Sequence, residues 1–143
     1  MENNFAFGLK GIEIVNSIIQ APTEPRQLTT FGFDIQFRVT PNPKENVVVI
    51  FVDIKVKDQE QKDQLGQFSA LFYFGVDDLE KNISMGELNQ AEIPQPLFST
   101  LVGISASTIR GLMFSAFKGT FLHNAILPLV DIGNLQPELA LPN

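Results

Sequence analysis

The segment from Leu97 to Phe117 is almost free of charge, because Arg110 is the only charged residue among otherwise apolar or small side chains. Its length and composition predict a long helix, and Gly119 suits the left-handed conformation that commonly follows a helix end. Pro128 cannot extend the helix, since proline has no amide hydrogen to donate. A helix with apolar residues on every side must be covered on every side. The segment therefore predicts that the chain assembles with a partner.

The sequence before this helix alternates between apolar and polar residues in the manner of β-strands. Residues 31–40 place their apolar side chains on one face, and residues 47–57 and 67–76 continue the pattern. Residues 5–14 change phase near Gly11, which predicts a β-bulge in one long strand. Consecutive strands joined by short polar connections predict an antiparallel sheet.

These patterns predict an α+β fold in which a four-stranded antiparallel sheet is followed by a long helix packed on one face. A chain of 143 residues can bury a core without disulfides or structural metals. We expect one domain, 1–143, with strands within about 5–76, a loop at 77–95, the helix at about 96–118 and an extended tail at 119–143.

Composition narrows the partners and the compartment. The net charge of −6 argues against nucleic acid and against an anionic membrane surface, because both require clustered Lys and Arg. Residues 1–7 lack the basic and apolar regions of a secretory signal. Arg110 and six Ser/Thr residues argue against membrane insertion of the long helix. We expect a cytoplasmic location.

The sequence offers few residues for catalysis. There is no cysteine, and a Ser-His-acid triad would depend on His123, the only histidine. Asp77, Asp78 and Glu80 lack the alternating ligand spacing of a calcium loop, so we interpret them as a solvated turn. No glycine-rich loop joins a strand to a helix. These features predict a protein that is not an enzyme and that has no metal or cofactor.

Small residues recur along the predicted helix and would permit close approach of a neighbouring backbone. Each glycine costs about 1 kcal/mol of helix stability relative to alanine. The small residues are explained either by packing on the chain's own sheet or by contact with a partner's helix on the other side. The second explanation gives a predicted oligomer interface consisting of Gly103, Ser107, Gly111 and Phe114.

A second apolar set lies on the sheet face that should point away from the helix. It consists of Val47, Val49, Phe51, Leu71 and Tyr73. If the strands at 47–57 and 67–76 pair, these side chains would form one cluster. An apolar outer face requires a cover, which would be the amino-terminal segment, another subunit or an unfolded polypeptide.

The sequence after the long helix resembles a segment of the protein-export chaperone family SecB. Lys118-Gly119-Thr120-Phe121, followed by Leu127-Pro128-Leu129-Val130-Asp131, is similar to the basic-Gly-Thr-Phe turn and Leu-x-Pro-Val-type sequence of that family. The resemblance covers residues 5–131. It implies an ATP-independent holdase that binds unfolded polypeptide clients in apolar grooves. It also implies a homo-oligomer, a dimer of dimers with the long helices between the sheets, and the export motor SecA as a partner.

We predict a client-binding groove formed by Pro22, Pro25, Val47, Val49, Phe51, Leu71 and Tyr73. The two prolines lie in the expected crossover loop at residues 20–30. Flanking polar groups would allow the groove to accept many sequences.

The chain departs from the exporters in two places. Residues 132–143 are broken at Pro137 and Pro142, where exporters have another helix that takes part in contact with SecA. Residues 106–110 replace the family's Pro-Tyr-Ala-Arg sequence. With these departures the chain resembles the divergent SecB-like branch, some of whose members are chaperones that serve toxin–antitoxin systems, so a dedicated client such as an antitoxin is an alternative to general preproteins.

Two other functions fit the same apolar pattern. A carrier of a small hydrophobic ligand would use the space between sheet and helix, and it predicts a closed cavity. A structural oligomer subunit would use the outer face as a permanent interface, and it predicts an oligomer that binds no unfolded peptide.

Overall fold

A computed structural model describes residues 5–22, 30–59, 63–85, 91–128 and 138–139. The long strands are β1 (Phe7–Ile19), β2 (Phe31–Asn42), β3 (Val47–Asp58) and β4 (Gln64–Val76), and the long helix is α2 (Gln95–Phe117). The short elements are the 3-10 turn η1 (Pro43–Glu45), α1 (Leu79–Asn82), β5 (Ser84–Met85), β6 (Ala91–Glu92) and β7 (Glu138–Leu139).

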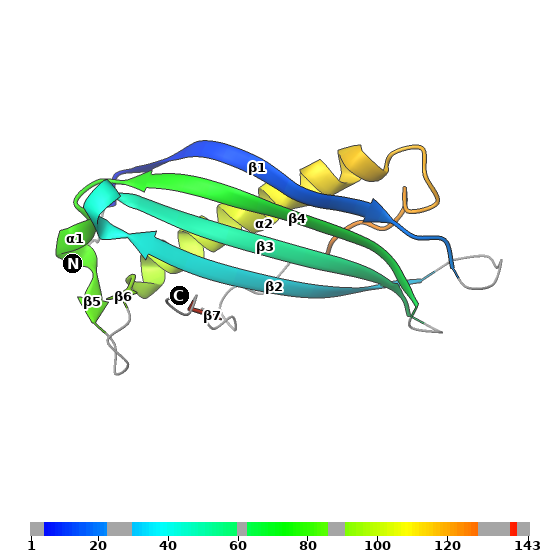
Figure 1. Cartoon of the computed structure of the whole chain (residues 1–143), viewed down its shortest axis with the longest axis horizontal. Coiled ribbons are helices and arrows are strands. Elements are labelled where there is room, and N and C mark those ends of the chain that lie inside the picture. The colour runs from blue at the N-terminus through cyan, green and yellow to red at the C-terminus, as the bar shows by residue number, and fades with distance from the viewer. Residues whose placement is uncertain (1–4, 23–29, 60–62, 86–90, 129–137, 140–143) are drawn as a thin grey trace.

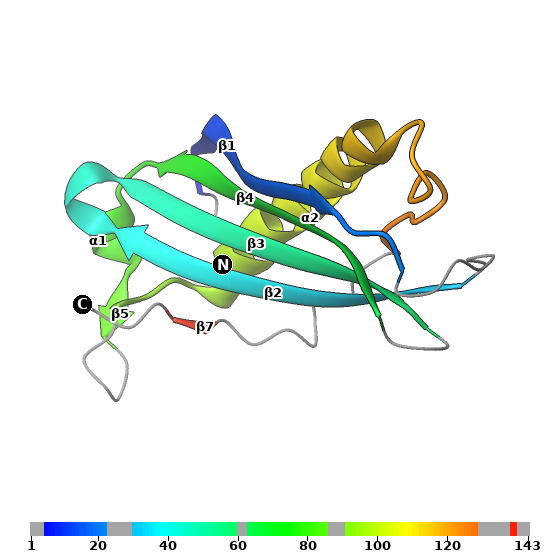
Figure 2. The ribbon, with the colours of Figure 1, turned by 45° about the vertical axis from the view of Figure 1, so that its right-hand side comes forward.

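The main sheet has the strand order β1-β4-β3-β2-β7, and α2 runs diagonally behind it (Figures 1 and 2). The pairs β1–β4, β4–β3 and β3–β2 are antiparallel. This architecture confirms the predicted α+β fold with four long antiparallel strands and a long helix on one face. β1 and β2 are consecutive in the chain, but β4 and β3 lie between them in the sheet.

Two short pairings were not predicted. β5 and β6 form a small hairpin inside the segment expected to be a loop. β7 pairs in parallel with β2 at Arg38 and Val39, in a tail expected to have no element. β5, β6 and β7 have two residues each, so none of them is long enough to show an alternating pattern in the sequence.

The predicted bulge in the first strand is confirmed. The β1–β4 register shifts between Leu9 and Gly11 and shifts again between Ile14 and Asn16. Each bulge inserts a residue and bends the strand. The second bulge was missed, because it carries no glycine and lies at the end of the alternating pattern.

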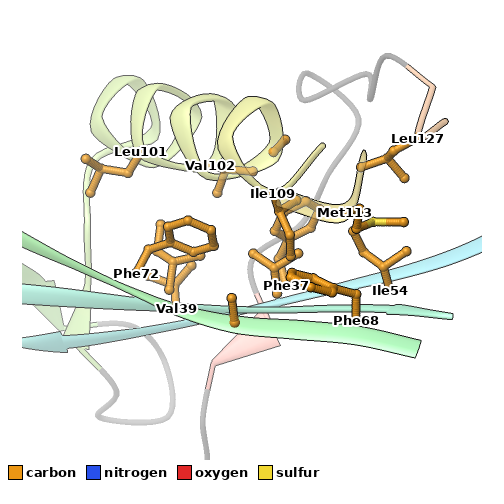
Figure 3. Close-up of a cluster of buried hydrophobic side chains, with 14 of the residues drawn as sticks. Phe37, Val39, Ile54, Phe68, Phe72, Leu101, Val102, Ile109, Met113 and Leu127 are labelled. Atoms are coloured by element: carbon orange, nitrogen blue, oxygen red, sulfur yellow. The ribbon is translucent and has the colours of Figure 1, made fainter. Parts of the chain in front are cut away.

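The core lies between the sheet and one side of α2, as Figure 3 shows. Its members shown there include Phe37 and Val39 from β2, Ile54 from β3, Phe68 and Phe72 from β4, and Leu101, Val102, Ile109 and Met113 from α2. The rings of Phe68 and Phe117 meet edge to face, with centroids 6.3 Å apart. The phenylalanines that alternate along β2 and β4 thus supply much of the core, as the pattern predicted.

The ends of α2 follow from its flanking residues. Pro94 precedes the first helical residue, and Pro96 occupies the first turn, where its missing amide hydrogen costs nothing. Gly119 has φ of 81°, the left-handed conformation expected just after the helix. By length and composition alone, α2 is apolar enough to cross a membrane. In this fold its apolar side is buried against the sheet.

A close approach at Gly66 holds the segment after the helix against β4. A Cβ atom added to Gly66 would lie 2.7 Å from Leu122 Cδ1 and 3.2 Å from the Ile18 carbonyl oxygen. The backbone atom cannot move aside without disturbing β1.

We expect Gly66→Ala to destabilise the fold by about 1–3 kcal/mol, because the added methyl group overpacks this contact. Gly32→Ala is the matched control, since no atom lies within 4 Å of its added Cβ. It should change stability by no more than about 0.5 kcal/mol. Urea denaturation followed by circular dichroism measures both, and equal stability of the two variants would contradict the packing argument.

Candidate functional site

The outer face of the sheet, which points away from α2, carries the predicted apolar cluster. The β3–β4 register places Val49 opposite Tyr73 and Phe51 opposite Leu71, with Val47 opposite Gly75. All five apolar side chains are half-buried. We call Val47, Val49, Phe51, Leu71 and Tyr73 the outer-face cluster. The structure therefore brings together the five sheet residues that were predicted to lie together.

Polar side chains border the outer-face cluster on two sides. The Arg38 guanidinium carbon lies 5.8 Å from the centre of the Phe51 ring, a cation–π geometry. The Tyr73 hydroxyl donates a hydrogen bond to the Glu13 carboxylate at 3.0 Å. This hydrogen bond raises the pKa of Tyr73 above its ordinary value of 10.0, with smaller contributions from burial and from the Glu13 charge. A surface with an apolar centre and a border of both charges can hold apolar side chains without demanding one sequence.

An open hollow of about 400 Å³ lies at the end of the outer-face cluster, beside the turn between β2 and β3. Val47 lines it and joins it to the cluster, and Lys10, Glu45 and Asp77 give it charges of both signs. The stem of Lys10 lies over Gly75, where an added Cβ would meet Lys10 Cε at 2.8 Å.

The crossover loop is only partly described. Pro22 is half-buried after the end of β1, and the Gln20 amide donates to the Leu65 carbonyl oxygen at 2.9 Å. Pro25 lies outside the described residues. The prediction that both prolines line the groove stays a prediction.

The most exposed apolar surface lies on β1, and the site prediction missed it. Among the described residues, ten large hydrophobic side chains are exposed and seven belong to β1. They are Phe7, Leu9, Ile12, Ile14, Val15, Ile18 and Ile19. β1 is the edge strand of the sheet, with only β4 beside it in the described structure. The apolar residues of 5–19 are visible in the sequence. Their alternation, however, is the same whether the apolar face of the strand is exposed or covered.

Most of these β1 side chains point to the same side of the sheet as the helix. Ile12 pairs with Phe72 and Ile14 with Ala70, and both partners are fully buried. Ile14 is nevertheless 52% exposed. The helix therefore covers the sheet without covering its edge, and an apolar row is left open along β1.

The side of α2 that faces away from the core carries the predicted interface residues. Ser107, Gly111 and Phe114 are exposed and Gly103 is half-buried, and Phe114 is 45% exposed. Ser105 and Ala106 lie on the buried side. Some of the small residues thus pack against the chain's own sheet, and others lie on the open side of α2, where helical periodicity also places the half-buried Arg110. Contact of this side with a partner's helix stays a prediction.

The segment after α2 turns back along the helix and carries His123. Its imidazole ring lies 5.6 Å from the Phe114 ring, centre to centre. Phe121 and Ile126 are exposed nearby in the same segment. Within the described part of the chain, no group of three or more His, Cys, Asp or Glu residues could hold a metal ion.

Comparison with known proteins gives a match by structure. No protein-family model matches the chain, and no curated protein matches its sequence. Among solved structures, the chain is similar to the SecB-like chaperone Rv1957 of Mycobacterium tuberculosis, in complex with a ChAD peptide from the antitoxin HigA1 (Rv1956). The likeness has a TM-score of 0.59 at 14% identity and covers 87% of this chain and 90% of that one. The chain has a SecB-like fold, which confirms at the level of the fold the resemblance noted in the sequence.

The hydrogen bond between Tyr73 and Glu13 predicts a distinctive titration. Because Tyr73 is the only tyrosine, ultraviolet absorbance of tyrosinate reports it alone. We expect its pKa above 10.0, and Glu13→Gln should move it back toward 10.0, because it replaces the charged acceptor of this hydrogen bond with a neutral amide. The stabilisation from this raised pKa is complete below pH 10 and is lost as pH rises through the folded-state pKa. A Tyr73 that titrates identically in both proteins would contradict this geometry.

Proposed function

We propose that this protein is an ATP-independent chaperone that holds non-native polypeptide. The observation that supports the proposal most directly is the amount of apolar surface that the fold leaves open: the edge strand β1, the outer-face cluster and the segment after α2. Contiguous exposed apolar surface on a folded protein marks a binding site. The SecB-like fold adds support, since the similar solved structure is itself a chaperone with a bound peptide.

The outer-face cluster suits an extended client segment. Each fully buried large apolar side chain contributes about 1.5–3 kcal/mol, so several anchors are needed to offset the ordering of an unfolded chain. The cluster and the adjoining hollow supply several anchors within one surface. Holding by burial requires no chemical step, so the proposed activity needs neither nucleotide nor metal.

We propose that the protein acts as a homo-oligomer, a dimer of dimers. The small-residue side of α2, with Gly103, Ser107, Gly111 and Phe114, suits close packing against the same side of a second copy. Arg110 lies on this side too, but its guanidinium is turned toward the Leu127 and Pro128 carbonyl oxygens. The open edge of β1 offers unpaired backbone groups and apolar side chains for pairing with another strand. Several weak client sites around one oligomer would then act together through their effective concentration.

The client we favour is a dedicated one, such as an antitoxin. The similar mycobacterial chaperone is bound to an antitoxin peptide, and this chain differs from the exporters in the region that contacts SecA. General preproteins and SecA are the alternative partners. Either client would be met in the cytoplasm, where we propose that the protein works.

A structural role is the second candidate function. The open small-residue side of α2 favours it, since a permanent interface would also use such a surface. The hollow of about 400 Å³ is open to solvent, whereas a carrier of a small hydrophobic ligand calls for a closed cavity. A measurement of client binding distinguishes the two functions, since a chaperone binds unfolded polypeptide and a structural subunit does not.

The purified protein, at near-stoichiometric concentration and without ATP, should suppress aggregation of a chemically unfolded protein, as measured by light scattering. Phe51→Asp and Tyr73→Asp should each weaken suppression several-fold, because a charge in the outer-face cluster opposes burial of apolar side chains. Gln36→Asp is the matched control, since it adds the same charge on an exposed position of β2 that pairs with Asp53, outside the cluster. If a folded oligomer carrying either cluster variant retained full suppression, the outer-face cluster would not be the client site.

Ser107→Arg should lower the mass of the assembly, because it places a long, unpaired charged side chain in the middle of the small-residue side of α2, where Arg110 is already engaged by the Leu127 and Pro128 carbonyl oxygens. Ala116→Arg is the control: Ala116 is also exposed, but helical periodicity places it on the other side of the helix. Light scattering coupled to size-exclusion chromatography measures both masses. An unchanged mass for Ser107→Arg would rule out assembly through this surface.

A further inference from the structure

Arg110, the only charged residue in α2, makes its hydrogen bonds to the segment that follows the helix. Its Nε donates to the Leu127 carbonyl oxygen at 2.9 Å, and its Nη2 donates to the Pro128 carbonyl oxygen at 3.4 Å. The planar guanidinium can reach two backbone carbonyls at once, which an ammonium group does less well. The Arg110 side chain therefore joins α2 to two backbone carbonyl groups that lie 17 and 18 residues later in the chain.

The tied segment, residues 119–128, is built by local hydrogen bonds. We call it the strap. The Thr120 hydroxyl donates to the Phe117 carbonyl oxygen at 2.7 Å and accepts from the Leu122 amide at 3.1 Å. Further along, the Ala125 amide donates to the Leu122 carbonyl oxygen at 2.9 Å. These bonds shape the beginning and middle of the strap, and Arg110 fixes its end.

The strap buries some side chains and exposes others. Leu122, Ala125 and Leu127 are buried in the core, and Figure 3 shows Leu127 near Met113 and above Ile54. Phe121 and Ile126 lie between them in the sequence and are 42% and 55% exposed. The two exposed side chains therefore depend on the anchoring of their neighbours.

The strap adjoins the apolar edge of the sheet. Leu122 packs against the space above Gly66, and the backbone of Ile18 borders the same space. Ile18 and Ile19 are themselves exposed at the end of β1. The strap itself contains no charged residue, and Leu122 and Ile18 thus bring it next to the apolar end of β1.

We infer that Arg110 is a positioning residue for client binding. By holding the end of the strap, it presents Phe121 and Ile126 as an apolar anchor for an uncharged, apolar segment of an unfolded polypeptide. This inference rests on the proposed chaperone function and adds a second anchor to it, apart from the outer-face cluster. Arg110 itself touches no client in this account; it acts through the strap.

The test measures the affinity of the full-length protein for reduced, carboxymethylated α-lactalbumin, which cannot fold, by fluorescence anisotropy. Arg110→Met keeps the aliphatic stem and removes the hydrogen bonds. We expect it to weaken binding about tenfold, which is the effect of about 1.4 kcal/mol. The double variant Phe121→Ser/Ile126→Ser should weaken binding to a similar extent. Combining all three changes should add little, because Arg110 acts through the two side chains.

Hydrogen exchange supplies the structural readout. In Arg110→Met, the amides of Ala125 and Ile126 should exchange faster while those of β3 and β4 keep their protection. The double variant should leave all of these amides protected, since it removes only exposed side chains. Light-scattering mass should be unchanged in every variant.

If the wild-type protein binds the probe, three results would overturn the inference about Arg110. They are wild-type affinity in Arg110→Met, additive losses in the triple variant, and a reduced mass that makes the strap an interface between copies. Loss of protection across β3 and β4 would assign Arg110 to global stability instead. If wild-type protein does not bind the probe, the proposed function fails and the positioning role fails with it.

Discussion

The packing of α2 on β3 and β4 is the contact on which the rest of the structure depends. Ile109 and Met113 face Ile54 and Phe68 across a layer of fully buried side chains. Backbone hydrogen bonds hold the long strands in register. The apolar face of such a sheet must also be covered, so that its side chains are removed from water. The strap continues this cover beyond the helix end through Leu122 and Leu127.

The same contact explains what the fold leaves open. A helix is about 10 Å across, whereas strands lie about 4.8 Å apart, so one helix covers about two strands. α2 is placed over β3 and β4, and the side chains of β1 on the same side stay exposed. Ser107, Gly111 and Phe114, on the side of α2 away from the sheet, also stay exposed. The open apolar surfaces are thus a direct consequence of building a four-stranded sheet with a single long helix.

Those surfaces give the proposed function its physical basis. The outer-face cluster has a border of charge provided by Arg38 and Glu13, and the strap has none. Two surfaces of different character suit a client that alternates apolar and polar segments. The small-residue side of α2 suits a second copy of the chain better than a varied client, because small residues favour one closely fitting neighbour.

Much of the fold followed from the sequence because it depends on local periodicity. Alternation in 31–40 and 47–57 identified β2 and β3, Gly11 marked a bulge, and Gly119 marked the end of the helix. The outer-face cluster was also predictable, since its members follow from alternation once two strands pair. The resemblance to SecB depended on the sequence of the strap.

Only the tertiary structure decided which apolar residues stay exposed. Alternation in β1 shows that one face is apolar, but whether that face is covered depends on where a helix distant in the chain crosses the sheet. The role of Arg110 was hidden for a similar reason: a lone charge in an apolar helix has no partner in the sequence, and its carbonyl acceptors lie 17 and 18 residues away. The sequence by itself determined the elements and their apolar faces, because periodicity is local. The placement of those faces was decided by packing, which brings distant residues together.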